Sequence, residues 1–263
     1  MQLAIARLAT PRSLVSRTWH NLARSMTCQP KKGPSYKLKL ALPRDYSRVV
    51  EFMGATYMEN EPILVNVGLA GDCAAQPALL SAMHNHVSAG MTFFAEDHRG
   101  CLVAAVVNKN TRQAELMPPG YYTQTLGCEL PPKVAKLFDF YEYLARVPDL
   151  WATYCVDDIF ECTHLAVHPD HQGKGLARRL VAESWILGRD LAFRLFRIDC
   201  SSRYTAMIAE GFGWKCVYSL PYRRYFANGE FFFKCIQEPH TEIRTYVDEL
   251  DYCDGYYPPM RRR

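Results

Sequence analysis

One short segment constrains the fold more than any other: a hydrophobic run, a glycine-bearing turn and an amphipathic run follow one another directly. Residues 159–167 (IFECTHLAV) have the composition of a buried strand, and residues 175–191 have helical spacing. The turn between them contains Gln172, Gly173 and Gly175. Glycines let a ligand approach the backbone, and the free N–H groups and dipole of a helix start favour an anion. The segment therefore indicates a phosphate-binding turn, which the Gln172 amide can tie together.

Other types of turn compete for this segment. A P-loop, G-x-x-x-x-G-K-[ST], matches the Gly-Lys pair at 173–174, but His168 replaces its first glycine and Gly175 its hydroxyl residue, which excludes it. A dinucleotide turn, G-x-G-x-x-G, has its first two glycines, but Arg178 replaces the third. Asp199, at the end of the next strand, resembles a ribose-binding acid, so this alternative stays open. An ordinary strand-to-helix turn, with glycine supplying only backbone freedom, also stays open.

Periodicity along the rest of the chain predicts an α/β protein with a mixed (α+β) sheet. The strand–helix–strand order after residue 159 has a short crossover, which implies at least one parallel pair of strands. Pro62 pushes the residue before it out of helical geometry, which predicts a loop at 60–68. We expect strands at 36–42, 91–97, 101–108, 159–167, 195–200, 214–220 and 230–236, and helices at 44–58, 76–90, 132–147, 175–191 and 202–211.

The turn resembles the Q/R-x-x-G-x-G/A loop of the GNAT acetyltransferase superfamily, and the order of elements over 36–237 is the GNAT order. This resemblance implies a central mixed sheet with helices on both faces, and acetyl-CoA as the co-substrate. In that family the loop binds the pyrophosphate, and the preceding strand splays from its neighbour and pairs with the pantetheine arm like a short extra strand. The implied CoA-binding residues are Leu165, Ala166, Val167, Gln172, Gly173, Lys174, Gly175, Leu176 and Ala177.

Two further segments resemble the insect arylalkylamine N-acetyltransferases. Residues 60–63 (NEPI) resemble their D/N-E-P-L loop, which implies that Glu61 is the catalytic base. Residues 200–206 (CSSRYTA) resemble their C-S-S-x-x-S-A segment, which assigns its two functional serines to Ser201 and Thr205. Threonine keeps the hydroxyl and adds a methyl group. The competing interpretations are a solvated loop acid for Glu61, with Glu59 as its nearest rival, and helix capping for the two hydroxyls.

Many GNAT enzymes carry a general-acid tyrosine, and its position is occupied here by Ala209, counting back from Gly213-Trp214. This leaves Ser201 as the candidate proton donor. A primary amine arrives as an ammonium ion and must lose a proton before it attacks a thioester, which a carboxylate with a raised pKa achieves. Direct transfer is expected, since the sequence has no G-x-S-x-G elbow and no Cys/His pairing that implies an acyl-enzyme.

The sequence therefore predicts an N-acetyltransferase for a small primary amine, and the resemblance implies an arylalkylamine such as dopamine, tryptamine or serotonin. One alternative is an acyltransferase for polyamines or amino acids that uses longer acyl-CoA donors. The other is a non-catalytic module that binds CoA. We expect no metal, because His164, His168 and His171 straddle a strand, a proline and a loop instead of sharing one face.

Charge is distributed unevenly along the chain. Residues 1–35 carry six Lys/Arg and no acid, and subtracting them from the overall net charge of +4 leaves −2 for the remainder. Nothing therefore calls for nucleic acid as a partner. The head is interpreted as a basic disordered tail, a segment upstream of a start at Met26, or a mitochondrial transit peptide. Residues 36–237 form the predicted domain, and 238–263 a peripheral C-terminal tail.

Cysteine spacing and hydropathy suggest the cellular setting. The ten cysteines are scattered without a C-x-x-C pair, which favours reduced thiols and a cytoplasmic protein, or the mitochondrial matrix if the head is a transit peptide. No window reaches the roughly 18 apolar residues of a membrane span. We expect a monomer or a weak dimer.

Overall fold

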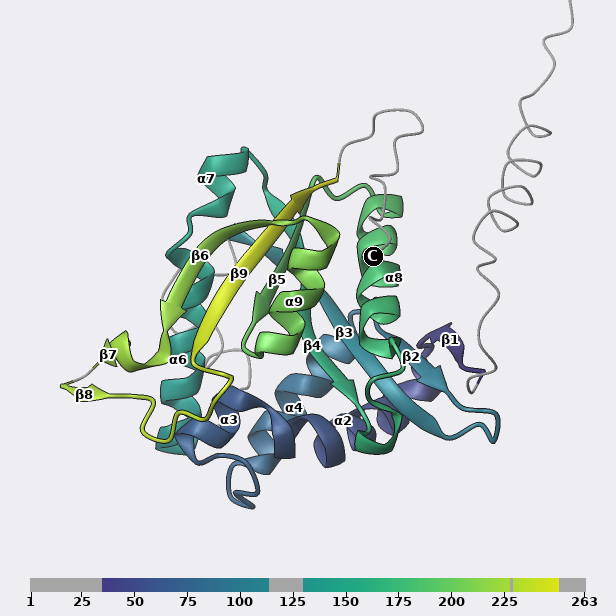
Figure 1. Cartoon of the computed structure of the whole chain (residues 1–263), viewed down its shortest axis with the longest axis horizontal. Coiled ribbons are helices and arrows are strands. Elements are labelled where there is room, and N and C mark those ends of the chain that lie inside the picture. The colour runs from purple at the N-terminus through teal and green to yellow at the C-terminus, as the bar shows by residue number, and fades with distance from the viewer. Residues whose placement is uncertain (1–34, 114–129, 228, 251–263) are drawn as a thin grey trace, which may run out of the picture. The chain divides into compact units, whose positions relative to one another are not determined.

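The computed structural model describes residues 35–113, 130–227 and 229–250 (Figure 1). The chain divides into two units, Met1–Ser35 and Tyr36–Arg263. The predicted basic tail or transit peptide lies outside the described residues, apart from Ser35. All the elements below belong to the second unit.

A seven-stranded mixed sheet forms the centre of this unit (Figure 1). All neighbouring strands are antiparallel except β4 and β5, which are parallel. This is the parallel pair that the short crossover predicted. In spatial order the strands are β1 (Lys37–Leu40), β2 (Phe93–Glu96), β3 (Leu102–Arg112), β4 (Asp158–Val167), β5 (Leu195–Cys200), β9 (Glu242–Glu249) and β6 (Lys215–Pro221).

Helices cover both faces of the sheet, as the sequence predicted. Their bounds are α2 (Tyr46–Asn60), α3 (Pro62–Val67), α4 (Gln76–Val87), α6 (Pro132–Arg146), α7 (Leu150–Tyr154), α8 (Leu176–Asp190) and α9 (Arg203–Phe212). Short 3-10 turns occupy Pro43–Asp45, Pro169–His171 and Tyr222–Arg224, and a small separate hairpin pairs β7 (Phe226–Ala227) with β8 (Glu230–Phe231).

Alternation along β3 explains why two cores form. Ala105 and Val107 join the core beneath α2, α3, α4 and α6, whereas Ala104 and Val106 join the core beneath α8 and α9. Successive side chains of a strand point to opposite faces, so a strand that is apolar at every position serves two cores at once. Figure 1 shows α8 running along its face of the sheet.

The parallel pair of strands is short and opens into a fork. Only Phe160, Glu161 and Cys162 of β4 pair with β5. Beyond Cys162 the strand continues to Val167 paired with β3 on one side, and with no β5 partner among the described residues on the other. We call the space between the diverging ends of β4 and β5 the fork. It leaves one edge of β4 open along Leu165–Val167, which is the splay that the resemblance implied.

The predicted loop at 60–68 is only partly correct. Glu61 is extended, with φ of −68° and ψ of 121°, as expected before a proline. Pro62–Val67, however, forms the short helix α3. Proline has no N–H to lose at the first position of a helix and its fixed φ suits that position, so the same proline that ends one helix begins the next.

The prediction of a last strand at 230–236 and a peripheral tail from 238 is wrong. Only Glu230–Phe231 is a strand there, and Glu242–Glu249 forms β9, between β5 and β6 in the central sheet. The three phenylalanines at 231–233 are typical of a strand, but Phe233 lies outside any strand and is buried against the ring of Tyr222. The charges of β9 hid its strand, although several of them have partners: Arg244 pairs with Glu242, for example. The folded domain therefore extends to Leu250, whose N–H bonds the Arg194 carbonyl.

The position of β9 predicts a large effect of a polar substitution at its centre. Val247 is buried and lies between Arg197 of β5 and Lys215 of β6. We expect Val247→Asn to lower the free energy of unfolding by about 2 kcal/mol or more, because it removes apolar burial and places an amide among buried apolar side chains such as Leu195. Urea denaturation followed by circular dichroism measures this. The exposed neighbour Glu249→Gln is the control and should stay within about 0.5 kcal/mol of wild type. Equal unfolding of both variants would show that β9 is peripheral.

Candidate active site

A single pocket collects the residues that the sequence proposed as catalytic. It is an open cavity of about 120 Å³ that lies at the fork on the side of α2, α3, α4 and α6. Glu61, Ser201, Thr205 and Leu165 all line it. Glu61 precedes α3, Ser201 follows β5, and the other two residues belong to α9 and β4, so the fold gathers in one place groups that lie as far as 144 residues apart in sequence.

Glu61 is a buried carboxylate at the junction of α2 and α3. It is 8% exposed, and its Oε1 accepts a hydrogen bond from the Ile63 N–H at 3.4 Å as the N-cap of α3. Burial raises the pKa of this carboxyl, and the hydrogen bonds from Ser201, Ile63 and Tyr57 only partly offset it. The interpretation of Glu61 as a solvated loop acid is therefore wrong, whereas Glu59 is exposed. A raised pKa suits a carboxylate that takes up and releases protons near neutral pH.

Ser201 lies beside Glu61 where β5 gives way to α9. The helix cap is the next residue, since Ser202 accepts the Tyr204 N–H at 3.2 Å. The Ser201 side chain is thus not used as the cap, and its carbonyl accepts a hydrogen bond from the Tyr222 hydroxyl at 2.9 Å. Thr205 follows one helical turn later and faces the same pocket. A carboxylate and a hydroxyl next to each other can remove one proton and supply another.

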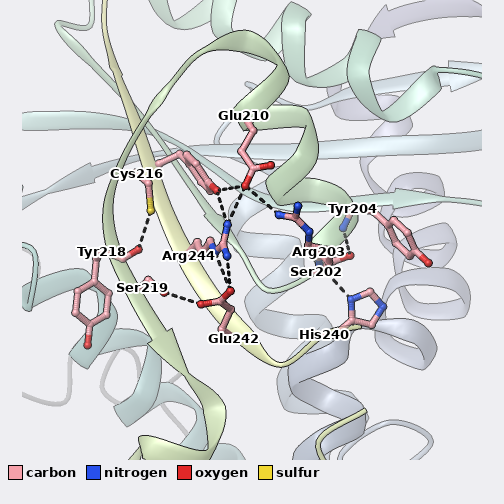
Figure 2. Close-up of polar contacts among 11 residues, drawn as sticks. Ser202, Arg203, Tyr204, Glu210, Cys216, Tyr218, Ser219, His240, Glu242 and Arg244 are labelled. Carbon is pink, nitrogen blue, oxygen red and sulfur yellow. Dashed lines mark hydrogen bonds and ion pairs between the residues drawn. The ribbon is translucent and has the colours of Figure 1, made fainter. Parts of the chain in front are cut away.

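An ionic network fixes α9 against β9 and β6 (Figure 2). Glu210 Oε1 accepts hydrogen bonds from Arg203 at 2.9 Å, from Arg244 at 2.8 Å and from the Tyr246 hydroxyl at 3.0 Å. Glu242 binds Arg244 and accepts the Ser219 hydroxyl at 2.7 Å. These groups are partly exposed, so each pair contributes modestly to stability. Together they hold the helix whose first residues carry the site.

The glycine turn has the backbone that an anion site requires. Gly173 and Gly175 have φ of 70° and 75°, a left-handed conformation that glycine adopts without strain, and no atom lies within 4 Å of a Cβ built on either. As predicted, the Gln172 amide ties the loop together, donating to the Val167 carbonyl at 3.2 Å. Lys174 Nζ donates to the Asp170 carbonyl at 2.6 Å, and the Leu176 side chain is buried beneath the turn.

The topology of the sheet tests the dinucleotide turn, one of the alternatives that the sequence left open. A dinucleotide fold needs a doubly wound, mostly parallel sheet, whereas here β5 is followed across the sheet by two antiparallel neighbours. Asp199 lines the pocket, where it pairs with Arg197 at 2.7 Å. The dinucleotide alternative is therefore wrong.

Several polar residues of the pocket were not singled out as site residues from the sequence, and we call four of them the polar floor: His86, Lys109, Glu161 and His164. Lys109 Nζ lies 3.5 Å from Glu161 Oε2, and Thr111 also donates to this carboxylate. Burial alone would raise the pKa of Glu161, but Lys109 and Arg197 outweigh it and lower the pKa to about 2. In the sequence, the signal for part of this floor is a charged residue within each of two largely apolar strands, Lys109 in β3 and Glu161 in β4.

The two histidines of the polar floor form a neutral pair. His86 Nδ1 and His164 Nε2 are 3.1 Å apart and the rings are stacked, while the Tyr57 ring packs edge-on against His164. Burial and the charge of Lys109 lower the pKa of both, that of His164 to about 3. His168 and His171 are in ring contact with each other, His168 capping the 3-10 turn before Gln172 and His171 ending it. In the described part of the chain, no three His, Cys, Asp or Glu side chains are grouped to hold a metal ion.

Comparison with solved structures identifies the fold. Arylalkylamine N-acetyltransferase 2 from Aedes aegypti superposes with a TM-score of 0.73 at 21% identity, over 82% of this chain and 100% of that one. The polyamine N-acetyltransferase of Drosophila melanogaster gives 0.67 at 22%, over 82% and 100%. The C-terminal condensation domain of Ebony gives 0.65 at 10%, over 82% and 100%. No protein-family model matches the sequence. The chain has the GNAT acetyltransferase fold that the sequence predicted.

Within the described residues, no helix has both the length and the apolar character that crossing a bilayer requires.

Burial of Glu61 predicts a pH-dependent gain in stability on removing its charge. The folded state raises the pKa of this carboxyl above the ordinary value of 4.5, so its ionised form destabilises the protein at neutral and alkaline pH. We expect Glu61→Gln to have a higher Tm than wild type at about pH 8. The difference should vanish as the pH falls below 4.5, where the glutamate is protonated in both states.

Thermal denaturation across this pH range measures the effect. Glu59→Gln, two residues away and exposed, is the matched control and should follow wild type at every pH. A lower Tm of Glu61→Gln at about pH 8 would mean that the hydrogen bonds accepted by the carboxylate outweigh the cost of its burial.

Proposed function

We propose that this protein is an acyl-CoA-dependent N-acetyltransferase that acetylates a small primary amine, with Glu61 as the general base. The observation that carries the proposal is the buried carboxylate of Glu61 beside the Ser201 hydroxyl, in a pocket at the fork. The fold and the N-acetyltransferases that share it support the same activity. The three solved structures compared above are at most 22% identical to this chain, so the assignment of the activity depends on the residues of the site.

The CoA thioester would be held by two backbone features. The open edge of β4 at Leu165–Val167 offers main-chain groups to the pantetheine amides, as in the addition of a short strand. The turn formed by residues 172–177 offers N–H groups and the positive end of α8 to the pyrophosphate. The space around Gly173 and Gly175 fits this use, because a side chain there would occupy the approach of the phosphates. Acetyl-CoA acts as a co-substrate.

The reaction removes two protons from the ammonium nitrogen and supplies one to the leaving thiolate. Glu61 takes a proton from the ammonium ion, directly or through a water molecule, and the freed amine attacks the thioester carbonyl. The C–N bond forms, the C–S bond breaks, and the thiolate leaves with the proton of the Ser201 hydroxyl. The second proton of the acylated nitrogen restores that hydroxyl, and the proton held by Glu61 passes to solvent. Positioning the amine and the thioester together at the fork provides the remaining acceleration. Thr205, in the same pocket, is proposed to assist Ser201.

The acceptor is proposed to be an arylalkylamine. Apolar and aromatic side chains line much of the pocket, among them Leu79, Met83 and Phe138, which suits a ring attached to an amine chain. The alternative, a polyamine or amino acid acceptor with a longer acyl donor, has support from the polyamine N-acetyltransferase of the same fold. A module that binds CoA without catalysis would leave the buried Glu61 unused. The cytoplasmic or mitochondrial location and the monomeric or weakly dimeric state stay predictions.

Replacing Glu61 tests the base. We expect Glu61→Gln to bind acetyl-CoA as wild type does and to lower kcat for amine acetylation by about 10²–10⁴-fold, as for the loss of a general base. The acid limb of the wild-type kcat/KM profile, which reports deprotonation of Glu61 above its ordinary pKa of 4.5, should disappear in the variant. Release of free CoA thiol measures turnover. Glu59→Gln should keep full activity, and unchanged turnover of Glu61→Gln would exclude Glu61 as the base.

The glycine turn is tested by a pair of substitutions that are equal in backbone strain. Gly175 and Gly100 both have a left-handed φ, 75° and 80°, and open space around them, but Gly100 lies in the β2–β3 hairpin. We expect Gly175→Ala to weaken acetyl-CoA binding by about tenfold or more, because the strained turn no longer presents its N–H groups to the pyrophosphate. Gly100→Ala should destabilise the fold similarly and leave binding unchanged. Titration calorimetry distinguishes them, and equal affinities would exclude the turn as the phosphate site.

A further inference from the structure

Tyr57 of α2 lines the pocket close to Glu61, and the proposed transfer chemistry does not use it. The Glu61 N–H donates to the Tyr57 carbonyl at 2.8 Å, so the end of α2 brings the two residues together. The Tyr57 hydroxyl also donates a hydrogen bond to the Glu61 carboxylate. We infer that Tyr57 is a positioning residue of the transfer reaction, whose phenol fixes the orientation of the Glu61 carboxylate and stabilises its ionised form. The inference rests on the proposed function, in which Glu61 is the base.

The histidines of the polar floor support the Tyr57 ring. It packs edge-on against His164, with 4.9 Å between the ring centroids and 71° between the ring planes. His164 in turn stacks on His86, with 5.3 Å between centroids. Both histidines are neutral near pH 7, since burial and the charge of Lys109 lower their pKa values. The phenol therefore reaches Glu61 from a ring that residues of β4 and α4 support, and this support does not change its charge near neutral pH.

Three hydrogen-bond donors converge on the Glu61 carboxylate. The Ile63 N–H donates at 3.4 Å, and the hydroxyls of Ser201 and Tyr57 also donate. An ionised carboxylate has about four acceptor positions, so about one remains for an ammonium ion or a bridging water molecule. Ser201 is the proposed source of the proton for the leaving thiolate. Tyr57 is therefore the side-chain hydroxyl that stays with Glu61 while Ser201 gives up and regains its proton.

The other phenols near this pair have different contacts. Tyr222, in the 3-10 turn after β6, is fully buried and donates to the Ser201 carbonyl at 2.9 Å. Tyr141 of α6 lines the pocket and lies near both Tyr57 and Tyr222. Burial and the charge of Glu61 raise the pKa of Tyr57 and that of Tyr222. Both hydroxyls therefore stay protonated and able to donate over the pH range in which Glu61 titrates.

The charged groups at the pocket are paired with one another. Lys109 Nζ lies 3.5 Å from Glu161 Oε2, and Asp199 pairs with Arg197 at 2.7 Å. Burial has the largest effect on the pKa of Glu61, and the three hydrogen bonds follow it. Each hydrogen bond to the ionised form lowers the pKa of a carboxyl, so the loss of one donor raises it.

The pH profile of the reaction tests the inference. Tyr57→Phe removes one oxygen atom and keeps the ring that packs on His164, so the variant should fold. We expect the acid limb of its kcat/KM profile to move to higher pH by about 0.5–1 pH unit, because the ionised Glu61 loses a donor. With the same amine, kcat/KM should be about three- to tenfold below wild type on the acid limb, and the difference should shrink towards the alkaline plateau.

Tyr143→Phe is the matched control for this profile. The Tyr143 hydroxyl is also partly buried and bonds the Tyr218 hydroxyl at 2.8 Å, but Tyr143 does not line the pocket. We expect its acid limb to stay at the wild-type pH. An acid limb that moves equally in both variants, or in neither, overturns the inference, because a merely structural role of Tyr57 would lower stability without moving the limb.

Thermal denaturation tests the same contact without turnover. At about pH 8, the change in Tm caused by Glu61→Gln should be more favourable in the Tyr57→Phe background than in wild type, because a phenol bonds a carboxylate more strongly than an amide. In the Tyr143→Phe background the change should equal that in wild type. Equal changes in all three backgrounds overturn the inference, and the proposed function stands as long as amines are acetylated. Absence of turnover for every amine overturns the proposed function and the inference together, whatever the Tm values.

Discussion

The short parallel pairing of β4 and β5 is the constraint on which the rest of this structure depends. After three paired residues the strands diverge, so the sheet is continuous at one end and open at the other. The opening exposes the backbone edge of β4, brings the end of β5 with Ser201 close to Glu61, and gives the pocket its position within the fold. The insertion of β9 between β5 and β6 supports β5 from its other side, so β5 stays paired where it leaves β4.

Glu61 and Glu161 are both carboxylates that burial alone would shift to a higher pKa, but their neighbours give them different protonation states. Glu61 has neutral or weakly polar neighbours, so burial dominates and raises its pKa. Glu161 has two cations nearby, and its pKa falls to about 2. One carboxylate is thereby suited to exchange protons while the other stays ionised and holds Lys109 in place. The separation of these two roles depends on neighbours that come from different strands and helices.

Much of the sheet followed from sequence periodicity. The hairpin of β2 and β3, the strands β4 and β5 and the helix α8 lie close to their predicted positions, because local alternation and turn residues specify such elements. The last strand was misplaced because its charged residues masked it while the aromatic run near Phe233 imitated a strand. Those charges are tolerated only because partners such as Glu210, for Arg244, arrive from other elements, which no local pattern reveals.

The sequence by itself determined the glycine turn, the extended residue before Pro62 and the hydroxyl pair at the start of α9, since each depends on a few neighbouring residues and their backbone preferences. Only the tertiary structure decided that Glu61 is buried beside Ser201, and that Lys109, Glu161 and two histidines form the far end of the same pocket. Solvation and the electrostatic effect of neighbouring charges depend on distances through space, and the fold sets those distances between residues far apart in the chain.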